Sequence, residues 1–268
     1  MLIAPIDHPL NLTMQTILTV GSWAITLAFL FAAFRKGRQQ QTPFFLLLVI
    51  AGGIGGIFEP LYDVGFKLLF YVPGQWTMFS AFGVPQPVWT ISGYVTLFSG
   101  PAMLIADRIA NGMSREALQR WFAVLIVTTA AFEMTGINGE AYEYWGAHAL
   151  RIFQYPLVVG VLEAAMVVTL GVAAAAFRAR ATSSWQLVGL VPLFLIVFYG
   201  VNFGLGAPTL VAIALSPASP ILVSAATLLS IAMAAAAVWS LSLTLPSSRT
   251  STRRSGALHK SNLHFLKN

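Results

Sequence analysis

Apolar residues along this chain gather into long runs, and short polar stretches separate them. Each run approaches the roughly 20 residues that an α-helix needs to cross the hydrocarbon core of a bilayer. The runs are continuous and lack the strict alternation that predicts a half-buried strand. We therefore predict an all-α polytopic membrane protein, a bundle of seven transmembrane helices that forms one domain over residues 1–246. The predicted helices are residues 12–34, 43–60, 87–106, 118–137, 152–177, 185–206 and 220–245.

The composition agrees with a chain embedded in lipid. Hydrophobic residues make up 57% of the 268 positions and charged residues only 9%, whereas charged residues make up about 25% of a soluble domain. The first run is followed directly by Arg35, Lys36 and Arg38 and has no basic segment before it, which predicts a spanning helix rather than a cleaved signal peptide. The sequence contains no cysteine, so disulfides, a catalytic thiolate and cysteine-ligated zinc are excluded.

The positions of the basic residues orient the predicted bundle. All 15 lysines and arginines except Lys67 and Arg151 fall in segments that alternate helices place on one side of the membrane. Since basic loops stay in the cytoplasm, we predict the N-terminus outside and the C-terminus in the cytoplasm. The basic, serine-rich tail, residues 247–268, is predicted to be disordered and to lie near anionic lipid headgroups. The net charge of +6 thus comes from basic residues that gather at the cytoplasmic surface of the bilayer. No nucleic-acid partner is predicted.

Acidic residues are concentrated toward the predicted outer side. Glu59 and Asp63 are four residues apart, so they share one face if the helix continues. Pro60 follows Glu59 at the end of an apolar run, which predicts a helix break whose freed backbone groups line a cavity. For Asp63 the alternative is a simple ion pair with Lys67, which extends the same spacing.

Glu163 lies deeper in the predicted bundle. It follows Arg151 by 12 residues, which at about 1.5 Å per residue is roughly 18 Å and places it near the bilayer midplane. A charge there costs about 2.5–3.5 kcal/mol, so such acids usually face the bundle interior and mark function. A neutral carboxyl that bonds a neighbouring helix is the structural alternative. The predicted catalytic residues are Glu59, Asp63, Glu133 and Glu163.

A second polar stretch, "FEMTGINGEAYEYWGAHALR", spans residues 132–151. Its acids, phenols and single histidine could exchange protons with an oxygenated ligand, and its rings could cover apolar carbon. An interfacial belt is the alternative for Tyr144 and Trp145. No second histidine stands at ligand spacing from His148, so no metal site is predicted. The predicted substrate-binding residues are Tyr71, Trp76, Trp89, Tyr94, Glu140, Tyr144, Trp145, His148 and Asn202.

Two further stretches bear on the fold. The connection over residues 71–89 contains several prolines and glycines and is predicted to be a long irregular loop, which is typical of a lid or a re-entrant segment. The run "GGIGG" at residues 52–56 predicts close helix approach.

Missing motifs exclude several classes of protein. No Asp-rich run offers magnesium to a prenyl diphosphate, and no Gly-rich loop precedes a Lys-Ser or Lys-Thr pair. Neither a Gly-x-Ser-x-Gly elbow nor a His-Glu-x-x-His helix is present. The last predicted helix contains no lysine, which excludes a retinal Schiff base. The remaining prediction is a carboxylate-rich cavity that opens to the outer side and uses no cofactor.

Two segments of the chain resemble a known family. "EPLYDVGFKLLFYVPGQWTMFSAFGVPQPVWTISGYV" and "EMTGINGEAYEYWGAHALRIFQYP" are similar to the spirocyclase AveC-like family of actinobacterial integral membrane proteins. The resemblance covers residues 50–160, and a looser similarity extends to membrane-embedded terpenoid cyclases. It implies ring closure of a lipophilic polyketide or terpenoid.

The sequence therefore predicts a multi-pass protein of a bacterial plasma membrane that closes rings in a lipophilic small molecule by acid-base catalysis. A proton-coupled small-molecule transporter is one alternative, because the same acids could relay protons. A non-catalytic membrane assembly subunit is another, with the acids paired to helices of a partner. The sequence leaves the oligomeric state open.

Overall fold

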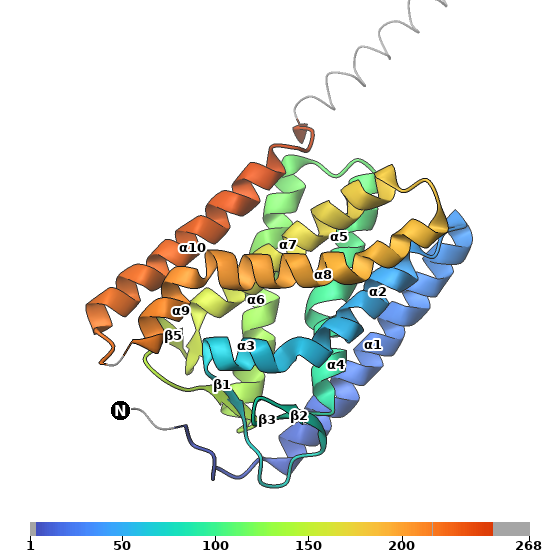
Figure 1. Ribbon diagram of the computed structural model, residues 1–268. Coiled ribbons are helices and arrows are strands. Elements are labelled where there is room, and N and C mark those ends of the chain that lie inside the picture. The colour runs from blue at the N-terminus through green and yellow to red at the C-terminus, as the bar shows by residue number, and fades with distance from the viewer. Residues whose placement is uncertain (1–3, 216, 249–268) are drawn as a thin grey trace, which may run out of the picture.

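The computed structural model describes residues 4–215 and 217–248, and its helices form one bundle (Figure 1). Within the described residues, six helices are long and apolar enough to cross a membrane. They are Leu12–Gln40, Phe44–Phe66, Arg115–Asn138, Leu157–Arg180, Ser184–Leu205 and Pro220–Ser242. The chain is thus a mostly helical, multi-pass membrane protein. The predicted tail lies outside the described residues from position 249 onward.

Four of these helices are unbroken α-helices: α1 (Leu12–Gln40), α6 (Arg115–Asn138), α7 (Leu157–Arg180) and α10 (Pro220–Ser242). The helix over Phe44–Phe66 consists of α2 (Phe44–Gly55), the 3₁₀ turn η1 (Gly56–Phe58) and α3 (Glu59–Phe66). The helix over Ser184–Leu205 consists of η3 (Ser184–Gly189), α8 (Leu190–Tyr199) and the π-helical η4 (Gly200–Leu205), after which comes α9 (Ala207–Ala214).

The third predicted helix is continuous but irregular. It consists of α4 (Trp89–Tyr94), the π-helical η2 (Val95–Ser99) and α5 (Gly100–Ala110). We refer to these three elements together as the 89–110 helix. A π-helical segment inserts an extra residue into the turn and turns the following side chains to another face, and such segments are frequent at functional sites.

The predicted break near Pro60 is present. The 3₁₀ turn η1 ends at Phe58, and Pro60 lies in the first turn of α3, where its missing N–H breaks no helical hydrogen bond. Figure 1 shows that α3 runs in a different direction from α2. The bend aims the first turn of α3, with Glu59, into the bundle, where that side chain is buried.

α7 forms the centre of the bundle. It packs against α5, α6, α8 and α10, and most of its side chains are buried. Because a helix surrounded by other helices presents no lipid-facing side, α7 can hold a polar side chain such as Glu163 away from lipid.

Short antiparallel strand pairs cover one end of the bundle, which we call the strand end (Figure 1). They pair β1 (Leu68–Phe70) with β4 (Tyr142–Tyr144), β2 (Thr77–Ala81) with β3 (Val84–Pro87), and β5 (Arg151–Ile152) with β6 (Tyr155–Pro156). The prediction of a wholly irregular 71–89 connection is therefore wrong in part, because residues 77–87 form a hairpin. Connections that lie against a bundle must pair their backbone groups, and strand pairing does so.

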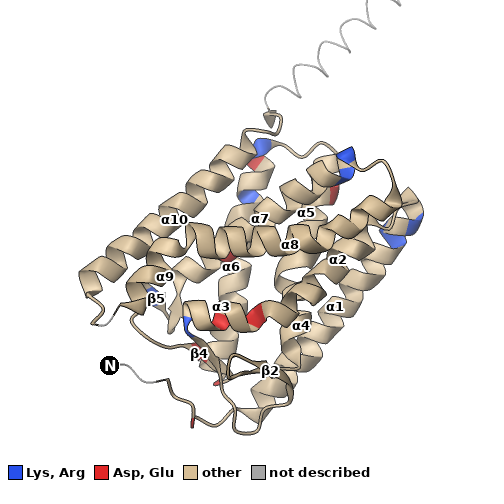
Figure 2. Ribbon diagram, in the orientation of Figure 1, with Lys and Arg blue, Asp and Glu red and all other residues tan. Residues whose placement is uncertain are grey.

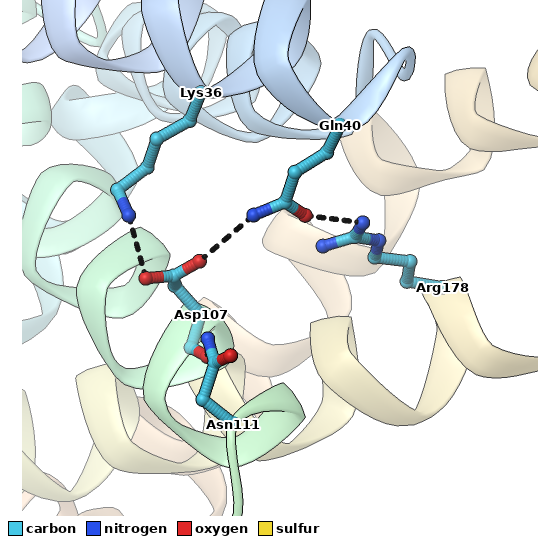
Figure 3. Close-up of polar contacts among 5 residues, drawn as sticks. All are labelled: Lys36, Gln40, Asp107, Asn111 and Arg178. Carbon is cyan, nitrogen blue, oxygen red and sulfur yellow. Dashed lines mark hydrogen bonds and ion pairs between the residues drawn. The ribbon is translucent and has the colours of Figure 1, made fainter.

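Figure 2 shows most lysines and arginines at the opposite, basic end of the bundle. There Lys36 Nζ donates to Asp107 Oδ2 at 2.6 Å, and Gln40 Nε2 donates to Asp107 Oδ1 at 3.4 Å (Figure 3). Arg178 Nη2 in turn donates to Gln40 Oε1 at 2.7 Å. These contacts join α1, α5 and α7, so they hold the basic end of the bundle together.

Candidate functional site

A cavity of about 50 Å³ lies inside the bundle toward the strand end. Three glutamates from three separate helices line it: Glu59 from α3, Glu133 from α6 and Glu163 from α7. All three side chains are buried, with exposed fractions of 7%, 6% and 3%. The other lining residues are Tyr62, Leu68, Phe70, Trp89, Thr90, Gly93, Tyr94, Leu97, Phe98, Phe132, Tyr142, Tyr144 and Phe198.

Each cavity glutamate accepts a hydrogen bond from a tyrosine. Tyr94 donates its hydroxyl to Glu59 Oε2. Tyr62 Oη donates to Glu163 Oε1, and Tyr144 Oη donates to Glu133 Oε2, both at 3.3 Å. A phenol hydroxyl replaces part of the hydration that a carboxyl group loses on burial, which makes these positions tolerable inside a membrane bundle.

Asp63 lies beside the cavity and does not line it. Its side chain is 1% exposed, and Gln86 Nε2 on β3 donates to its Oδ2 at 2.5 Å. Thr90 Oγ1 donates to Gln86 Oε1 at 3.3 Å and completes the chain of contacts. Asp63 is one helical turn from Glu59, so the two carboxyl groups interact across the turn.

The alternative ion pair between Asp63 and Lys67 is wrong: these two described residues form none. Lys67 ends α3 in the left-handed conformation, with φ of 53°. Its Nζ donates instead to the carbonyl of Ile213 at 2.5 Å and lies 5.1 Å from the ring centre of Trp145. The reversal of the backbone at Lys67 turns its side chain off the helical face that holds Asp63.

Aromatic rings form much of the cavity wall. Phe70 meets Trp89 edge to face with ring centres 6.1 Å apart, and Tyr94 meets Phe98 in the same way at 5.0 Å. Phe198 lies 5.1 Å from Tyr94 and adds a third side. Ring faces attract positive charge, so a cationic carbon formed in this cavity would be stabilised by its walls.

The strand pair β1–β4 closes the strand end of the cavity. The register pairs Leu68 with Tyr144 and Phe70 with Tyr142, and all four side chains are buried lining residues. These buried side chains fill the strand end of the cavity, and the prediction that the cavity opens to the outer side of the membrane stays a prediction. Burial, together with the nearby Glu133 carboxyl, raises the pKa of the Tyr142 and Tyr144 phenols well above 10, which keeps both hydroxyls protonated.

Six of the predicted substrate-binding residues lie outside the cavity. Glu140 is exposed, and Trp76 is 49% exposed. Trp145 is half-buried under Lys67, and Asn202 donates to the Phe198 carbonyl at 3.0 Å. The remaining two are Tyr71 and His148. The predicted residues that do line the cavity are Glu59, Glu133, Glu163, Trp89, Tyr94 and Tyr144.

Tyr71 and His148 have structural contacts at the strand end. Tyr71 Oη donates to Glu143 Oε2 at 3.2 Å and its ring stacks on His8. His148 Nε2 lies 2.9 Å from the Phe66 carbonyl, and burial, with the nearby Arg151 charge, lowers the pKa of His148 to about 4. The ring is therefore neutral near pH 7 and donates to Phe66 through Nε2.

Sequence reasoning missed several lining residues, two of which carried a usable signal. Tyr62 follows Glu59 by three residues, a spacing that places two side chains on one helical face. Tyr142 precedes Tyr144 by two residues, which places both on one face of a strand. Phe98, Phe132 and Phe198 carried no signal, because their apolar runs contain many equivalent phenylalanines and leucines.

Within the described residues, no three histidine, aspartate or glutamate side chains are grouped as metal ligands. Comparison of the chain with family models, with curated proteins and with solved structures finds no significant match in any of the three.

Proposed function

We propose that this chain is an integral membrane enzyme that closes a ring in a lipophilic polyketide or isoprenoid by acid-base catalysis. The observation that carries the proposal is the convergence of Glu59, Glu133 and Glu163 on one buried, aromatic-walled cavity. A carboxyl group buried in the membrane is costly and usually serves function, and this bundle brings three such groups together. The spiroketal or terpenoid character of the ring rests on the family resemblance of residues 50–160.

The lining residues suggest how the chemistry divides among the carboxyl groups. Among the described residues, no lysine or arginine lines the cavity, so three carboxyl groups that share this one space cannot all be ionised. A neutral Glu133 or Glu163 gives its proton to a ketone, enol ether, epoxide or alkene of the substrate. Glu59 takes up the proton released when the ring closes. Asp63, one turn away, interacts with Glu59 and stabilises it as it takes up this proton. Proton transfer between the carboxyl groups then restores the starting state.

Two physical effects supply the rate. General acid-base assistance typically contributes about 10²–10⁴-fold. The remainder comes from holding a flexible chain in the shape that closes the ring. Trp89, Tyr94 and Phe98 line the space where positive charge develops, and aromatic rings attract positive charge.

The proposal includes seven spans, an outer N-terminus and a cytoplasmic C-terminus, in a bacterial plasma membrane. Strand pairing supports the seventh span: β1 and β4 must lie on one side of the membrane, and the chain between them contains α6 and the 89–110 helix. If α6 crosses, the 89–110 helix must cross as well. The basic end, which the positive-inside rule assigns to the cytoplasm, supports the orientation.

Single Glu→Gln substitutions test the enzyme. Glu59→Gln, Glu133→Gln and Glu163→Gln keep side-chain size and remove the exchangeable proton. We expect each to lower product formation by about 10²-fold or more, measured by mass spectrometry of lipid extracts from cells that express each variant. Ring closure gives a product of unchanged mass or one that has lost water, so the product is sought at those two masses. Glu140→Gln, at an exposed site outside the cavity, is the matched control.

Near-normal product formation in all three variants would end the enzyme proposal. Purified protein in liposomes separates the alternatives that remain. Proton-coupled uptake of a small molecule without a new product would indicate a transporter. A stoichiometric partner that co-purifies, with no activity of the chain alone, would indicate an assembly subunit.

A further inference from the structure

We infer that the substrate is a molecule dissolved in the bilayer, and that it reaches the cavity sideways from the lipid, between the 89–110 helix and α6. Gly93 lies in this path. The inference deepens the proposed function and rests on it for the identity of the substrate. The path itself can be tested without turnover.

Exposure of the cavity wall locates the path. Of the 16 lining residues, all but three are buried. The three half-buried residues are Gly93 and Leu97 of the 89–110 helix and Phe132 of α6. They come from two elements that line the same cavity, and they mark where its wall comes closest to the surface. We call these three residues the lateral seam.

Packing of the two helices explains why the seam exists. α6 packs against α7 and α10, whereas α4 and η2 pack mainly on α1 and α2. Among the described residues, the 89–110 helix and α6 do not pack extensively on each other. The two backbones therefore approach each other at few points along this line, and an exposed side chain between them changes rotamer in picoseconds to nanoseconds.

Gly93 leaves an opening in this wall. A methyl group added at Gly93 would meet no atom within 4 Å, although the residue lines the cavity. Gly56, which packs against the same helix, behaves differently: an added carbon there would lie 3.0 Å from the Cα of Ile91. Gly93 therefore faces free space, which a large side chain at this position would fill.

The size of the cavity and its closed strand end support lateral access. A cavity of about 50 Å³ holds a few water molecules, whereas sites for drug-sized ligands measure about 300–1,000 Å³. The helices must therefore separate to admit a substrate. The strand end is held by paired backbone and buried tyrosines, while the lateral seam is lined by the half-buried Leu97 and Phe132 between two helices that pack little on each other. The seam opens at the lower cost.

An apolar carbodiimide tests the path. Dicyclohexylcarbodiimide partitions into bilayers and adds a protonated carboxyl group across its C=N bond, and the adduct rearranges to an N-acylurea that retains every atom of the reagent. Protein in liposomes is treated with this reagent or with a water-soluble carbodiimide of the same reactivity. Peptide mass spectrometry then locates and counts modified Glu59, Glu133 and Glu163. We expect modification by the apolar reagent to be faster by about tenfold or more.

Substitutions along the seam make the test specific. We expect Gly93→Phe to slow modification of the cavity glutamates by about tenfold, which corresponds to a barrier raised by about 1.4 kcal/mol. Gly21→Phe is the matched control, because Gly21 also faces open space but lies on the exposed side of α1. Leu97→Trp is a second occluding variant should Gly93→Phe fail to fold, and Gly93→Ala, which adds one methyl group to open space, should react like the wild type.

The lateral path is overturned if the folded occluding variant reacts as fast as the wild type, or if the water-soluble reagent reacts as fast as the apolar one. These results would leave the enzyme proposal standing, since they say nothing about turnover. Conversely, normal turnover in all three Glu→Gln variants would remove the enzyme and leave the lateral path intact. The two failures are therefore distinguishable.

Discussion

Tyrosine hydroxyls make the buried glutamates of this bundle tolerable. Tyr94, Tyr62 and Tyr144 each donate one hydrogen bond to one cavity glutamate. A phenol can donate to either a neutral or an ionised carboxyl group, so the pair survives a change in protonation. A lysine or arginine partner would hold the carboxyl group ionised instead. This choice of partner leaves the protons of the cavity free to move, as acid-base catalysis requires.

His148 provides a pH test at the strand end. Its pKa is lowered from 6.5 to about 4 in the folded protein, so between these pH values the unfolded chain binds more protons. Folding stability should therefore fall as the pH drops from about 6.5 to 4, by at most about 3 kcal/mol from this residue. The nearby charges are Arg151 and Lys67, and both oppose protonation of the ring.

The measurement is the thermal unfolding midpoint in detergent at several pH values for the wild type and for His148→Gln. Glutamine can still donate to the Phe66 carbonyl and has no titrating ring. We expect a shallower loss of stability toward pH 4 in the variant. Equal slopes for both proteins would contradict the assigned burial of His148.

Among the elements, two π-helical segments lie next to the cavity. Phe98 belongs to η2, and Phe198 lies in the turn before η4. Both phenylalanines line the cavity. The widened turns change which residues face inward, so a regular 3.6-residue period drawn through either helix assigns the wrong side chains to the interior.

Helix α2 approaches η2 closely at Gly52. A methyl group added there would lie 2.1 Å from Ser99 Oγ, whereas one added at Gly53 would have its nearest neighbour at an ordinary 3.6 Å. We expect Gly52→Ala to destabilise the protein by about 1–3 kcal/mol through overpacking, and Gly53→Ala to have little effect. Thermal unfolding in detergent measures both.

Gly52 and Gly53 are neighbours on α2 and are the same residue type, which makes Gly53→Ala a matched control. The double variant Gly52→Ala with Ser99→Gly removes the clashing side chain and should recover part of the loss. Equal stability of Gly52→Ala and Gly53→Ala would show that α2 and η2 are not in close contact.

At the scale of the whole molecule, the strand end and the basic end are chemically distinct. The strand end has its backbone paired and contains Lys67 and Arg151, while the basic end contains the Lys36–Asp107 ion pair and Arg178 (Figures 2 and 3). Loops on the outer side of a membrane can be long and structured, whereas cytoplasmic loops concentrate positive charge. The two ends fit the proposed orientation.

The absence of native cysteine permits a direct test of this topology. Ser80 on β2 and Ser183 before η3 are both exposed. The proposed topology places Ser80 outside the cell and Ser183 in the cytoplasm. In intact cells, a membrane-impermeant maleimide should label Ser80→Cys and leave Ser183→Cys unlabelled until the cells are opened. Labelling of both in intact cells would contradict seven spans, because a non-crossing 89–110 helix would place residue 183 outside.

Much of the site was predictable from residue type, and its assembly was not. Glu163 was expected in the interior because a carboxyl group in lipid is costly, and Glu59 was expected at a cavity because Pro60 follows it. His148 and Glu140 share the chemistry of the cavity residues but lie outside it. Their positions depend on how the 138–152 segment turns, and a single sequence carries no rule for such turns.

By itself, the sequence determined the membrane character, the approximate helices and the break near Pro60, because the length and composition of a segment govern its transfer into lipid and the proline ring acts locally. Only the tertiary structure decided which faces meet. The pairing of β1 with β4 closed the strand end of the cavity, Gln86 rather than Lys67 bonded Asp63, and the weak packing of the 89–110 helix against α6 left the lateral seam. Each of these depends on contacts between residues far apart in the chain, whose geometry the packing of the whole bundle determines.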